Sequence, residues 1–319
     1  KESYKAFEII KKYYNGEVTA NMIFANIEQA IMIQRMLGKA KEILDNELVV
    51  EKYMDVRGIV ACIRSYAVYD YLSSILQSED NGYVLNSKVL CAADYGAPQK
   101  RMRFVIVGVK KKISDKIALP IGSFDEDQYR TVRDAIEDLE AVTPVYSLEE
   151  DKGTNIGNVE EISVLGRQLR NTTVLKNHIV TKTTSTAMER FKALKQGQNF
   201  HALNDALKSN TYTDVSRTQN TIYLRLNYDE PSGTVVNVRK SMWIHPTLDR
   251  AISVREAARL QTFPDSFVFC GTKDKQYQQV GNAVPPIMAK AIAEKIDMVL
   301  RDKKTKHVNS EIAVRNKKK

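Results

Sequence analysis

The sequence predicts a two-part α/β protein, in which a part of mixed helices and strands is joined to a second part that is mostly β and irregular. Three observations lead to this fold class. Apolar residues follow a helical period over the first 80 residues, strand-like runs occupy 83–90 and 103–109, and a stretch rich in Thr, Asn and Ser fills most of 111–250. A length of 319 residues suits two domains, and a hydrophobic content of 43% provides apolar surface for a core.

The first 82 residues are predicted to form a mostly helical region. Ile23, Ile27 and Ile31 begin an apolar series that recurs mainly at three-to-four spacing, which is typical of a helix packed on one face. A second periodic stretch runs from about Met54 to Leu76. Such stripes are more often core than cofactor-binding surface, so no site is assigned to them.

The strand-like runs that follow, within 83–110, are joined by CAADYGAPQKRM, whose Gly-Ala-Pro is a turn signal. Strands joined in this way can form an antiparallel pair with a protruding loop. From Gln99 to Lys112 the chain carries six Lys or Arg residues and no acid. Arginines at the edge of a buried strand must be paired or must face an anion, because desolvating a guanidinium alone is costly.

Residues 111–272 form the predicted second domain. Its β-branched residues alternate with polar ones, which favours short strands and loops with few strong helices. Regular structure returns near the end of this range, where Ser253 and Glu256 have the spacing of a capping box that opens a helix.

The C-terminal end combines a helix with a basic tail. Pro285-Pro286 suits the first turn of a helix, which is predicted to reach Leu300 inside a segment, 273–302, that returns to the first part of the chain. Residues 303–319 are predicted to be a disordered tail. Residues 301–319 carry +6 of the net charge of +9, so overall basicity is weaker evidence of a polyanionic partner than the charge around Gln99.

Composition argues against several other classes. No apolar stretch approaches the roughly 18 residues of a membrane span, and the charged start KESYKAFEII is not a secretory signal. Three widely spaced cysteines indicate a reducing compartment without a disulfide framework, and the four histidines show no ligand spacing. We therefore expect a cytoplasmic protein with no metal site and no membrane partner.

Three blocks of the sequence carry a resemblance: ADYGAPQKRMRFVIVG (93–108), SVREAARLQTFPDSF (253–267) and YQQVGNAVPPIMAKAIAEKI (277–296). In this order they resemble the late motifs of the DNA cytosine-5 methyltransferases of bacterial restriction-modification systems. The resemblance covers roughly 85–319. It implies an incomplete Rossmann-like, S-adenosylmethionine-dependent methyltransferase domain with a smaller target-recognition domain. The implied activity is sequence-specific methylation of cytosine in double-stranded DNA.

The resemblance also implies roles for the residues of the first block. Gln99, Arg101 and Arg103 match the family's Gln-x-Arg-x-Arg motif, which serves a cytosine flipped out of the duplex. Arg103 would bind the cytosine edge, Arg101 would support it and contact the DNA backbone, and Gln99 would fix the loop. Arginine suits the first two tasks because it offers a rigid, charged fork of N–H donors. The alternative is that Arg101 and Arg103 form ion pairs within the fold.

The other two blocks contribute further candidates. Gly281, Asn282 and Val284 match the family's segment beside the S-adenosylmethionine pocket, although Gly-Asn before Pro-Pro is also an ordinary turn-to-helix signal. Arg255 and Arg259 lie four residues apart and so face one side of the predicted helix. They are candidate DNA-binding residues that could also brace the recognition loops or face solvent.

The family's early motifs are not recognisable. The sequence has no Pro-Cys dipeptide, in which the family's nucleophile lies, and no Gly-rich cofactor turn. Cys91 ends a predicted strand and is interpreted as a small core residue. Met54-Asp55-Val56 is a faint echo of the family's Glu-Asn-Val, but it lacks the acid that would protonate the cytosine ring at N3.

We therefore expect this chain to be the C-terminal portion of a longer methyltransferase, or one subunit of a split enzyme. A missing N-terminal catalytic half would supply the nucleophile and the rest of the cofactor site, in cis or as a separate subunit. Residues 1–82 would then be an insertion in the catalytic domain, and the 319 residues alone should not methylate DNA. The alternatives are a non-catalytic DNA-binding module and an unrelated nucleotide-binding α/β enzyme, although the latter has no Gly-x-Gly-x-x-Gly pattern to support it.

Overall fold

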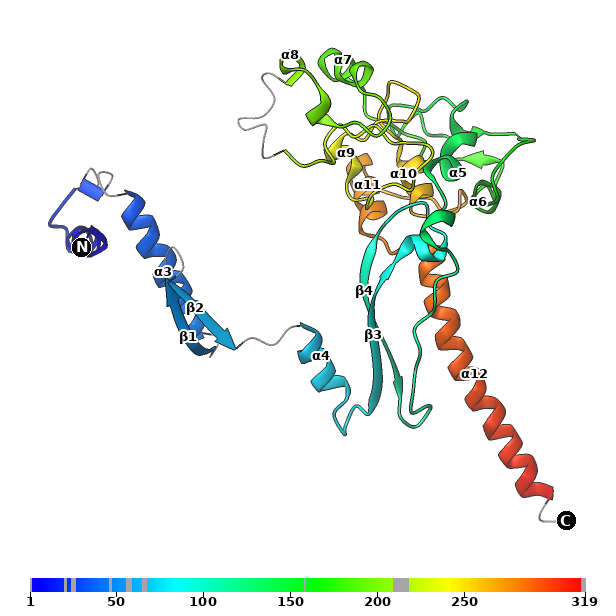
Figure 1. Ribbon diagram of the computed structural model, residues 1–319, viewed down its shortest axis with the longest axis horizontal. Coiled ribbons are helices and arrows are strands. Elements are labelled where there is room, and N and C mark those ends of the chain that lie inside the picture. Colours follow the sequence, from blue (N-terminus) through cyan, green and yellow to red (C-terminus); the bar gives the residue numbers. More distant parts are fainter. Residues whose placement is uncertain are drawn as a thin grey trace. The chain divides into compact units, whose positions relative to one another are not determined.

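The chain divides into two compact units, Lys1–Leu76 and Gln77–Lys319 (Figure 1). The computed structural model describes the backbone of residues 2–19, 22–23, 27–45, 48–55, 59–64, 68–157, 159–208 and 218–316.

The first unit combines helices with a strand pair. Its elements are α1 (Glu2–Tyr14), α3 (Ile27–Asp45), β1 (Val49–Asp55), β2 (Ile59–Arg64) and α4 (Val68–Leu76). The two strands are antiparallel, with Val49 opposite Arg64 and Asp55 opposite Ile59. The prediction of a helical period from Met54 is therefore wrong as far as Arg64. The run IVACIR is rich in β-branched residues, which fit a pleated strand better than a helix.

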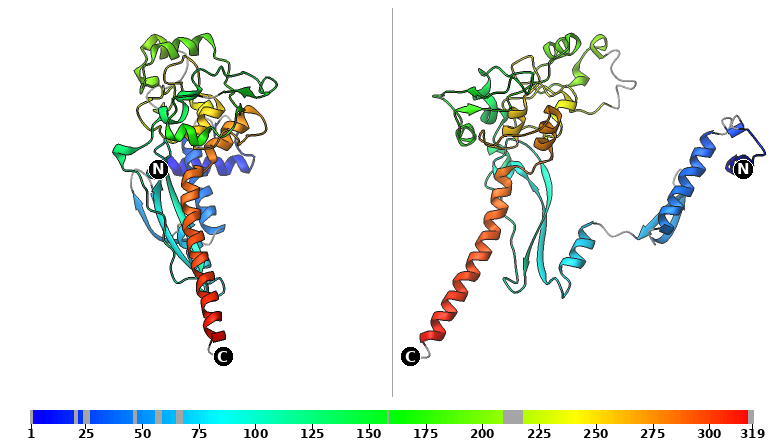
Figure 2. Two further views of the ribbon diagram at one scale, coloured as in Figure 1. Left: turned by 90° about the vertical axis from the view of Figure 1, so that its right-hand side faces the viewer. Right: turned by 180° about the vertical axis from the view of Figure 1, so that it is seen from behind.

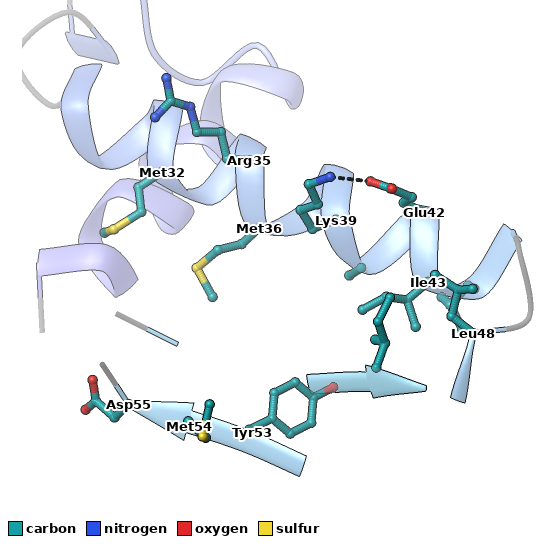
Figure 3. A pocket seen from close by; sticks show the side chains of 13 residues that line it. Met32, Arg35, Met36, Lys39, Glu42, Ile43, Leu48, Tyr53, Met54 and Asp55 are labelled. Atoms are coloured by element: carbon teal, nitrogen blue, oxygen red, sulfur yellow. Dashed lines mark hydrogen bonds and ion pairs between the residues drawn. The ribbon is translucent and has the colours of Figure 1, made fainter. Parts of the chain in front are cut away.

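A groove lies between α3 and β1 of this unit (Figure 3). It encloses about 1110 Å³, and its lining includes Met32, Met36, Ile43 and Tyr53. Two of the apolar side chains on its wall, Met36 and Tyr53, are 50% and 66% exposed. The apolar stripe that predicted a packed helix is thus only partly covered by the described residues of its own unit.

The second unit begins with a long antiparallel hairpin of β3 (Tyr83–Cys91) and β4 (Met102–Lys110) (Figure 1). Leu90 pairs with Arg103, and the pairing continues without a register shift to Tyr83 and Lys110. The predicted antiparallel pair is confirmed.

The loop between the two strands was predicted to protrude, and this is wrong. It opens with the short 3-10 turn η1 (Ala92–Tyr95), and most of its residues are buried. Ala92, Ala93 and Ala97 are 0% exposed, and the Tyr95 hydroxyl donates to the Pro120 carbonyl at 2.9 Å. Small side chains let the rest of the unit close over the loop, which the turn signal alone could not reveal.

One face of the hairpin is covered by helix α12 (Pro286–Asn316), drawn in orange to red (Figures 1 and 2). The apolar side chains in this contact include Leu90, Val105 and Val107 from the strands and Ile287, Ile292 and Ile296 from the helix. Successive strand residues point to opposite faces. The other face of the hairpin carries Val89, Met102 and Phe104, which are 50%, 55% and 53% exposed.

The end of α12 departs from the predicted disordered tail, because its backbone stays helical to Asn316. Lys, which is common in 303–319, is a good helix former, so a helix that is already nucleated can extend into this segment. None of the described helices is long and apolar enough to cross a membrane.

Between the hairpin and α12 the chain is largely irregular, with short helices (Figure 1). Its elements are α5 (Val132–Ile136), α6 (Val164–Leu169), α7 (Ser185–Ala193), α8 (Asp205–Lys208), α9 (Val238–Ser241), α10 (Val254–Leu260), α11 (Lys273–Asn282), the strands β5 (Thr154–Asn155) and β6 (Val174–Leu175), and the 3-10 turns η2 (Glu126–Gln128), η3 (Glu137–Leu139) and η4 (Phe200–Ala202).

The irregular character of this region is as predicted, but among its described residues the named strands are only two residues long each. Some hydroxyl residues of this region cap short helices. Thr131, Ser163 and Thr184 each accept a backbone N–H at a helix start, which is what short hydroxyl side chains do well.

Trp243 is 0% exposed and belongs to the largest apolar cluster found among the described residues of this unit. Val254 and Leu260 of α10 and Tyr277 and Val280 of α11 belong to the same cluster. The segment 273–302 contains two helices with different neighbours, α11 and then α12, and α12 begins at Pro286, as the proline pair predicted. The first packs within the irregular region and the second packs on the hairpin.

Candidate functional site

The three sequence blocks meet where the β3–β4 loop contacts the ends of α10 and α11. Five residues form this contact, which we call the junction: Gln99, Arg101, Val235, Gln261 and Gly281. All five are buried. They come from four separate stretches of the chain, so their hydrogen bonds hold the loop, the irregular region and α11 in one arrangement.

Gln99 uses both ends of its amide. Its Nε2 donates to the Leu260 carbonyl at 2.9 Å and to Gln261 Oε1 at 2.8 Å, while its Oε1 accepts from the Val235 amide at 3.0 Å. Gln261 Nε2 in turn donates to the Val280 carbonyl at 2.8 Å. Only an amide offers donors and an acceptor on one short side chain, and these contacts connect the loop to α10 and α11.

Arg101 is 1% exposed and faces carbonyl groups. Its Nη1 donates to the Val235 carbonyl, and its Nη2 donates to the Gly281 carbonyl at 2.8 Å. No carboxylate of the described chain lies within ion-pair distance of it. Burial, together with a smaller repulsion from Arg103, lowers the pKa of Arg101 to about 10, so the group stays charged at neutral pH.

This environment corrects two expectations for Arg101. The alternative of an ion pair within the fold is not what the structure shows, because carbonyl oxygens surround the guanidinium instead. A direct contact with the DNA backbone is also wrong, because a side chain that is 1% exposed cannot reach a phosphate. The carbonyls of Val235 and Gly281 each accept one hydrogen bond from the guanidinium.

Gly281 allows α11 to approach the segment before α9. A Cβ atom at this position would lie 2.6 Å from both the carbonyl carbon and the oxygen of Val236, closer than real Cβ atoms come. Any larger residue would push the two backbones apart. The glycine thereby also brings its own carbonyl within reach of Arg101.

Arg103 lies on β4 opposite Leu90 and is only partly buried. Its Nη1 donates to the Met102 carbonyl at 2.8 Å. No other hydrogen bond of this guanidinium is found among the described residues. Most of its donors therefore remain available to a ligand, in contrast to those of Arg101.

The two other candidate cofactor residues, Asn282 and Val284, lie at the turn between α11 and α12. Asn282 is exposed, and no hydrogen bond of its side chain is found in the part of the chain described. Val284 is 45% exposed. A ligand can thus reach both side chains, whereas Gly281 beside them is buried.

The two arginines of α10 are fully enclosed. The guanidinium of Arg255 donates to the carbonyls of Lys176, Pro264 and Phe267 and to Asn177 Oδ1. Its pKa is lowered to about 10, chiefly by burial.

Arg259 is also 0% exposed, and it pairs with two carboxylates. It donates to both oxygens of Asp265, at 2.9 and 2.5 Å, and to Asp138. The prediction that Arg255 and Arg259 contact DNA is therefore corrected. Both brace the loops around α10, because these loops present inward carbonyls and carboxylates that only a long cationic fork can satisfy.

The sequence did not predict the buried ion pair between Glu256 of α10 and Arg250. The capping box of Ser253 and Glu256 is confirmed, and the Glu256 carboxylate also accepts from Arg250 at 2.8 and 2.6 Å. Burial alone would raise the pKa of Glu256, but the charge and hydrogen bonds of Arg250 hold it well below its usual range. The capping residue was visible in the sequence, whereas its arginine partner six residues earlier has no sequence signature.

His245 lies beside this pair, with its Nε2 3.8 Å from Glu256 Oε1. The backbone amides of Thr247 and Leu248 point at its Nδ1 from 3.3 and 3.2 Å, so that nitrogen must accept rather than carry a proton. Burial accordingly lowers the pKa of His245 to about 4. The imidazole is a neutral structural group at physiological pH.

The segment 232–236 has a role at the junction that the sequence did not predict. It acts through the backbone N–H and C=O of Val235, and a backbone contact carries no side-chain signal in one sequence.

Comparison with known proteins agrees with the resemblance. The family model of the C-5 cytosine-specific DNA methylases matches residues 60–298. The chain is 31% identical over 248 residues to the Type II methyltransferase M.DdeI of Desulfomicrobium norvegicum, covering 71% of this chain and 58% of that protein. It is 34% identical over 139 residues to the Type II methyltransferase M.AquIB of Picosynechococcus sp., covering 40% of this chain and 91% of that protein.

A solved E. coli protein, described as a DNA modification methyltransferase encoded within a prophage, has the same fold over 72% of this chain and 64% of its own. The TM-score is 0.56 at 25% identity. The predicted α/β methyltransferase fold class is thereby confirmed. The chain spans roughly half the length of the first curated relatives that it matches. With the family model covering most of its length, the chain belongs to the C-5 cytosine-specific DNA methylase family.

Proposed function

We propose that this chain is the C-terminal part of a cytoplasmic restriction-modification enzyme that methylates cytosine at C5 in double-stranded DNA. The observation that carries the proposal is the junction, which fixes the start of β4 and leaves most donors of Arg103 unused by the described residues. A rigidly placed cation with open donors suits a base that has to be held outside its duplex.

Arg103 is the residue assigned to the target cytosine. A guanidinium can donate to the O2 atom of a flipped cytosine, and its permanent charge stabilises the negative charge that develops on the ring when a thiolate adds to C6. Arg101 is a positioning residue. It holds the chain two residues before Arg103 against the carbonyls of Val235 and Gly281.

Asn282 and Val284 suit one wall of an S-adenosylmethionine site, since both are accessible at the turn after α11. The Asn282 amide can both donate and accept hydrogen bonds, and Val284 offers an apolar contact. Gly281 contributes indirectly, because it lets α11 pack closely against Val236 and its carbonyl accepts a hydrogen bond from Arg101. S-adenosylmethionine, when bound, supplies the methyl group that cytosine C5 receives.

A second part of the enzyme supplies the nucleophile and the remaining cofactor contacts. Cys91 ends β3 and is half-buried, and we do not assign the nucleophile to it. The face of the hairpin away from α12 leaves Val89, Met102 and Phe104 about half exposed. A strand that is apolar on both faces is typical of a sheet covered on both sides, so this face is where the N-terminal catalytic half would pack.

That half could belong to the same polypeptide or to a separate subunit. The match to M.AquIB favours the second arrangement, because 91% of that relative lies within the aligned region. A chain of this kind could also be a specificity subunit that binds DNA without carrying out the chemistry. Methyl transfer on addition of the N-terminal half distinguishes a catalytic subunit from a silent binder.

The proposal is tested by methyl transfer from labelled S-adenosylmethionine to duplex DNA by the complete enzyme, with analysis of the modified nucleoside. Arg103→Lys should lower kcat/KM by about a hundredfold or more, because a lysine cannot reproduce the fork of donors at the base. Arg167→Lys is the matched control, since Arg167 is exposed in the last turn of α6.

Both variants should keep the thermal midpoint of the parent. An unchanged rate in Arg103→Lys would remove Arg103 from the base pocket. Absence of 5-methylcytosine among the products of the complete enzyme would contradict the function itself.

A further inference from the structure

A small pocket lies in the irregular region, away from the junction residues. It encloses about 270 Å³ between the loop 181–184, the start of α7 and helix α9. Its lining includes Thr181, Lys182, Thr183, Thr184, Arg239 and Lys240, beside Ala187, Phe191, Met242, Ala251 and Tyr277. None of the described residues that line it is acidic. A pocket that combines three cations with hydroxyl groups is suited to an anion.

The three cations differ in how firmly they are held. Arg239 is fixed, because its Nη1 pairs with Asp274 and its Nε donates to Thr181 Oγ1 at 3.3 Å. Lys182 and Lys240 are exposed, and neither shows an ion pair or a hydrogen bond with the described part of the chain. The pocket therefore carries two positive charges that the described protein leaves uncompensated.

The hydroxyl groups of Thr181 and Thr184 can donate hydrogen bonds to an anion. The hydroxyl oxygen of Thr181 accepts from Arg239, and that of Thr184 accepts from the Ala187 amide at 3.3 Å. Each hydroxyl proton then remains able to donate. Phosphate oxygens only accept hydrogen bonds, and hydroxyl and ammonium donors are the groups that DNA-binding proteins use to hold them.

We propose that this pocket binds a backbone phosphate of the target duplex, an inference that rests on the proposed function. The backbone between Val235 and α9 connects the pocket to the junction. The Val235 carbonyl accepts from Arg101, and the next residue, Val236, is the one that a Cβ atom at Gly281 would meet. Helix α9, which carries Arg239, begins two residues later. Phosphate contacts set the register of a protein on its duplex. A phosphate held at α9 would thus be placed in a fixed position relative to Arg103.

The test compares two double variants of the complete enzyme in duplex binding over a series of KCl concentrations. Lys182→Gln with Lys240→Gln removes the two uncompensated charges. Lys192→Gln with Lys195→Gln is the matched control, because it removes the same charge from two exposed lysines, one in the last turn of α7 and one two residues beyond its end. All four side chains are exposed, so the thermal midpoints should not change.

For the loss of one phosphate contact, the slope of log K against log salt should shrink by about 0.9, which weakens binding about tenfold near 0.1 M salt. The affinities for target and non-target duplexes should fall by the same factor, because a phosphate carries no base identity. The control pair should leave the slope close to that of the parent enzyme.

Equal slopes in the two double variants would overturn the inference and leave the proposed function standing. A parent enzyme without salt-sensitive duplex affinity would overturn the proposed function, and this inference with it. Calorimetric titration with inorganic phosphate tests whether the pocket binds a free phosphate ion instead of a phosphate of the DNA backbone. Phosphate binding that is lost in the Lys182/Lys240 variant while its DNA slope is unchanged would show a site for the free anion, and would also overturn the inference.

Discussion

Arg101 and Arg103 lie two residues apart, yet different surroundings give their guanidinium groups different roles. The sequence motif identified both residues, but it could not show that one of them is enclosed by the carbonyls of Val235 and Gly281. The same holds for Arg255 and Arg259, whose helical spacing was correctly predicted and whose burial was not. Spacing shows which way a side chain points relative to its own helix, and only the tertiary fold decides what it meets.

Replacing Arg101 with lysine should therefore destabilise the protein. A single ammonium cannot reach both carbonyls, and leaving one of them buried and unpaired costs about 1–3 kcal/mol in the free energy of unfolding. Arg103→Lys should change that free energy by less than about 0.5 kcal/mol, because its side chain is partly open to solvent. Urea denaturation of both variants makes the comparison. Equal losses would show that the two residues are not divided into positioning and base-binding roles.

His245 predicts a pH dependence of stability. Its folded pKa of about 4 lies below the ordinary value of 6.5, so between these values the unfolded chain binds more protons than the folded one. The contribution of His245 to the free energy of unfolding should be fully present above pH 6.5. It should fall as the pH is lowered toward 4, by up to about 3 kcal/mol.

His245→Asn removes the titration and keeps an acceptor for the amides of Thr247 and Leu248. The plot of unfolding free energy against pH should then be shallower between pH 4 and 6.5. It should not become flat, since burial also lowers the pKa of His178. A slope identical to that of the parent would show that His245 is protonated in the folded state.

Among the helices and strands, the sequence predicted the ones that are marked by a local sequence pattern. The β3–β4 hairpin followed from two apolar runs and a turn, and α10 followed from its capping box. The strand pair at 49–64 was missed because a short apolar run satisfies either period. The burial of the β3–β4 loop was missed because it depends on segments more than a hundred residues away.

The close approach of α11 to the segment before α9 gives a prediction at this scale. Gly281→Ala should destabilise the protein by about 1–3 kcal/mol, because its new methyl group would meet the Val236 backbone, which cannot move as a side-chain tip could. Gly233→Ala is the matched control, since a methyl group at that position would have no other atom within 4 Å and the φ of Gly233 is ordinary.

The Gly233 variant should stay within a few tenths of a kcal/mol of the parent in chemical denaturation. If Gly281→Ala behaved in the same way, α11 and the segment before α9 would have to be separable, and the junction would not be a rigid unit.

At the scale of the whole molecule, the chain spans only part of the length of the relatives that it matches. The family model begins at residue 60, and the first curated relatives are considerably longer than the matched region. The sequence could indicate this because the missing motifs are local patterns, the Pro-Cys dipeptide above all. It could not indicate how the second part packs, because an exposed apolar face such as that of Val89, Met102 and Phe104 becomes visible only once the strands are paired.

The most direct test of the account is methyl transfer from labelled S-adenosylmethionine to duplex DNA by the 319-residue chain, alone and together with its N-terminal catalytic half. We expect no transfer by the chain alone, and transfer to cytosine C5 once the half that carries the nucleophile is present. Transfer by the chain alone would contradict it, because the nucleophile would then have to lie within these residues.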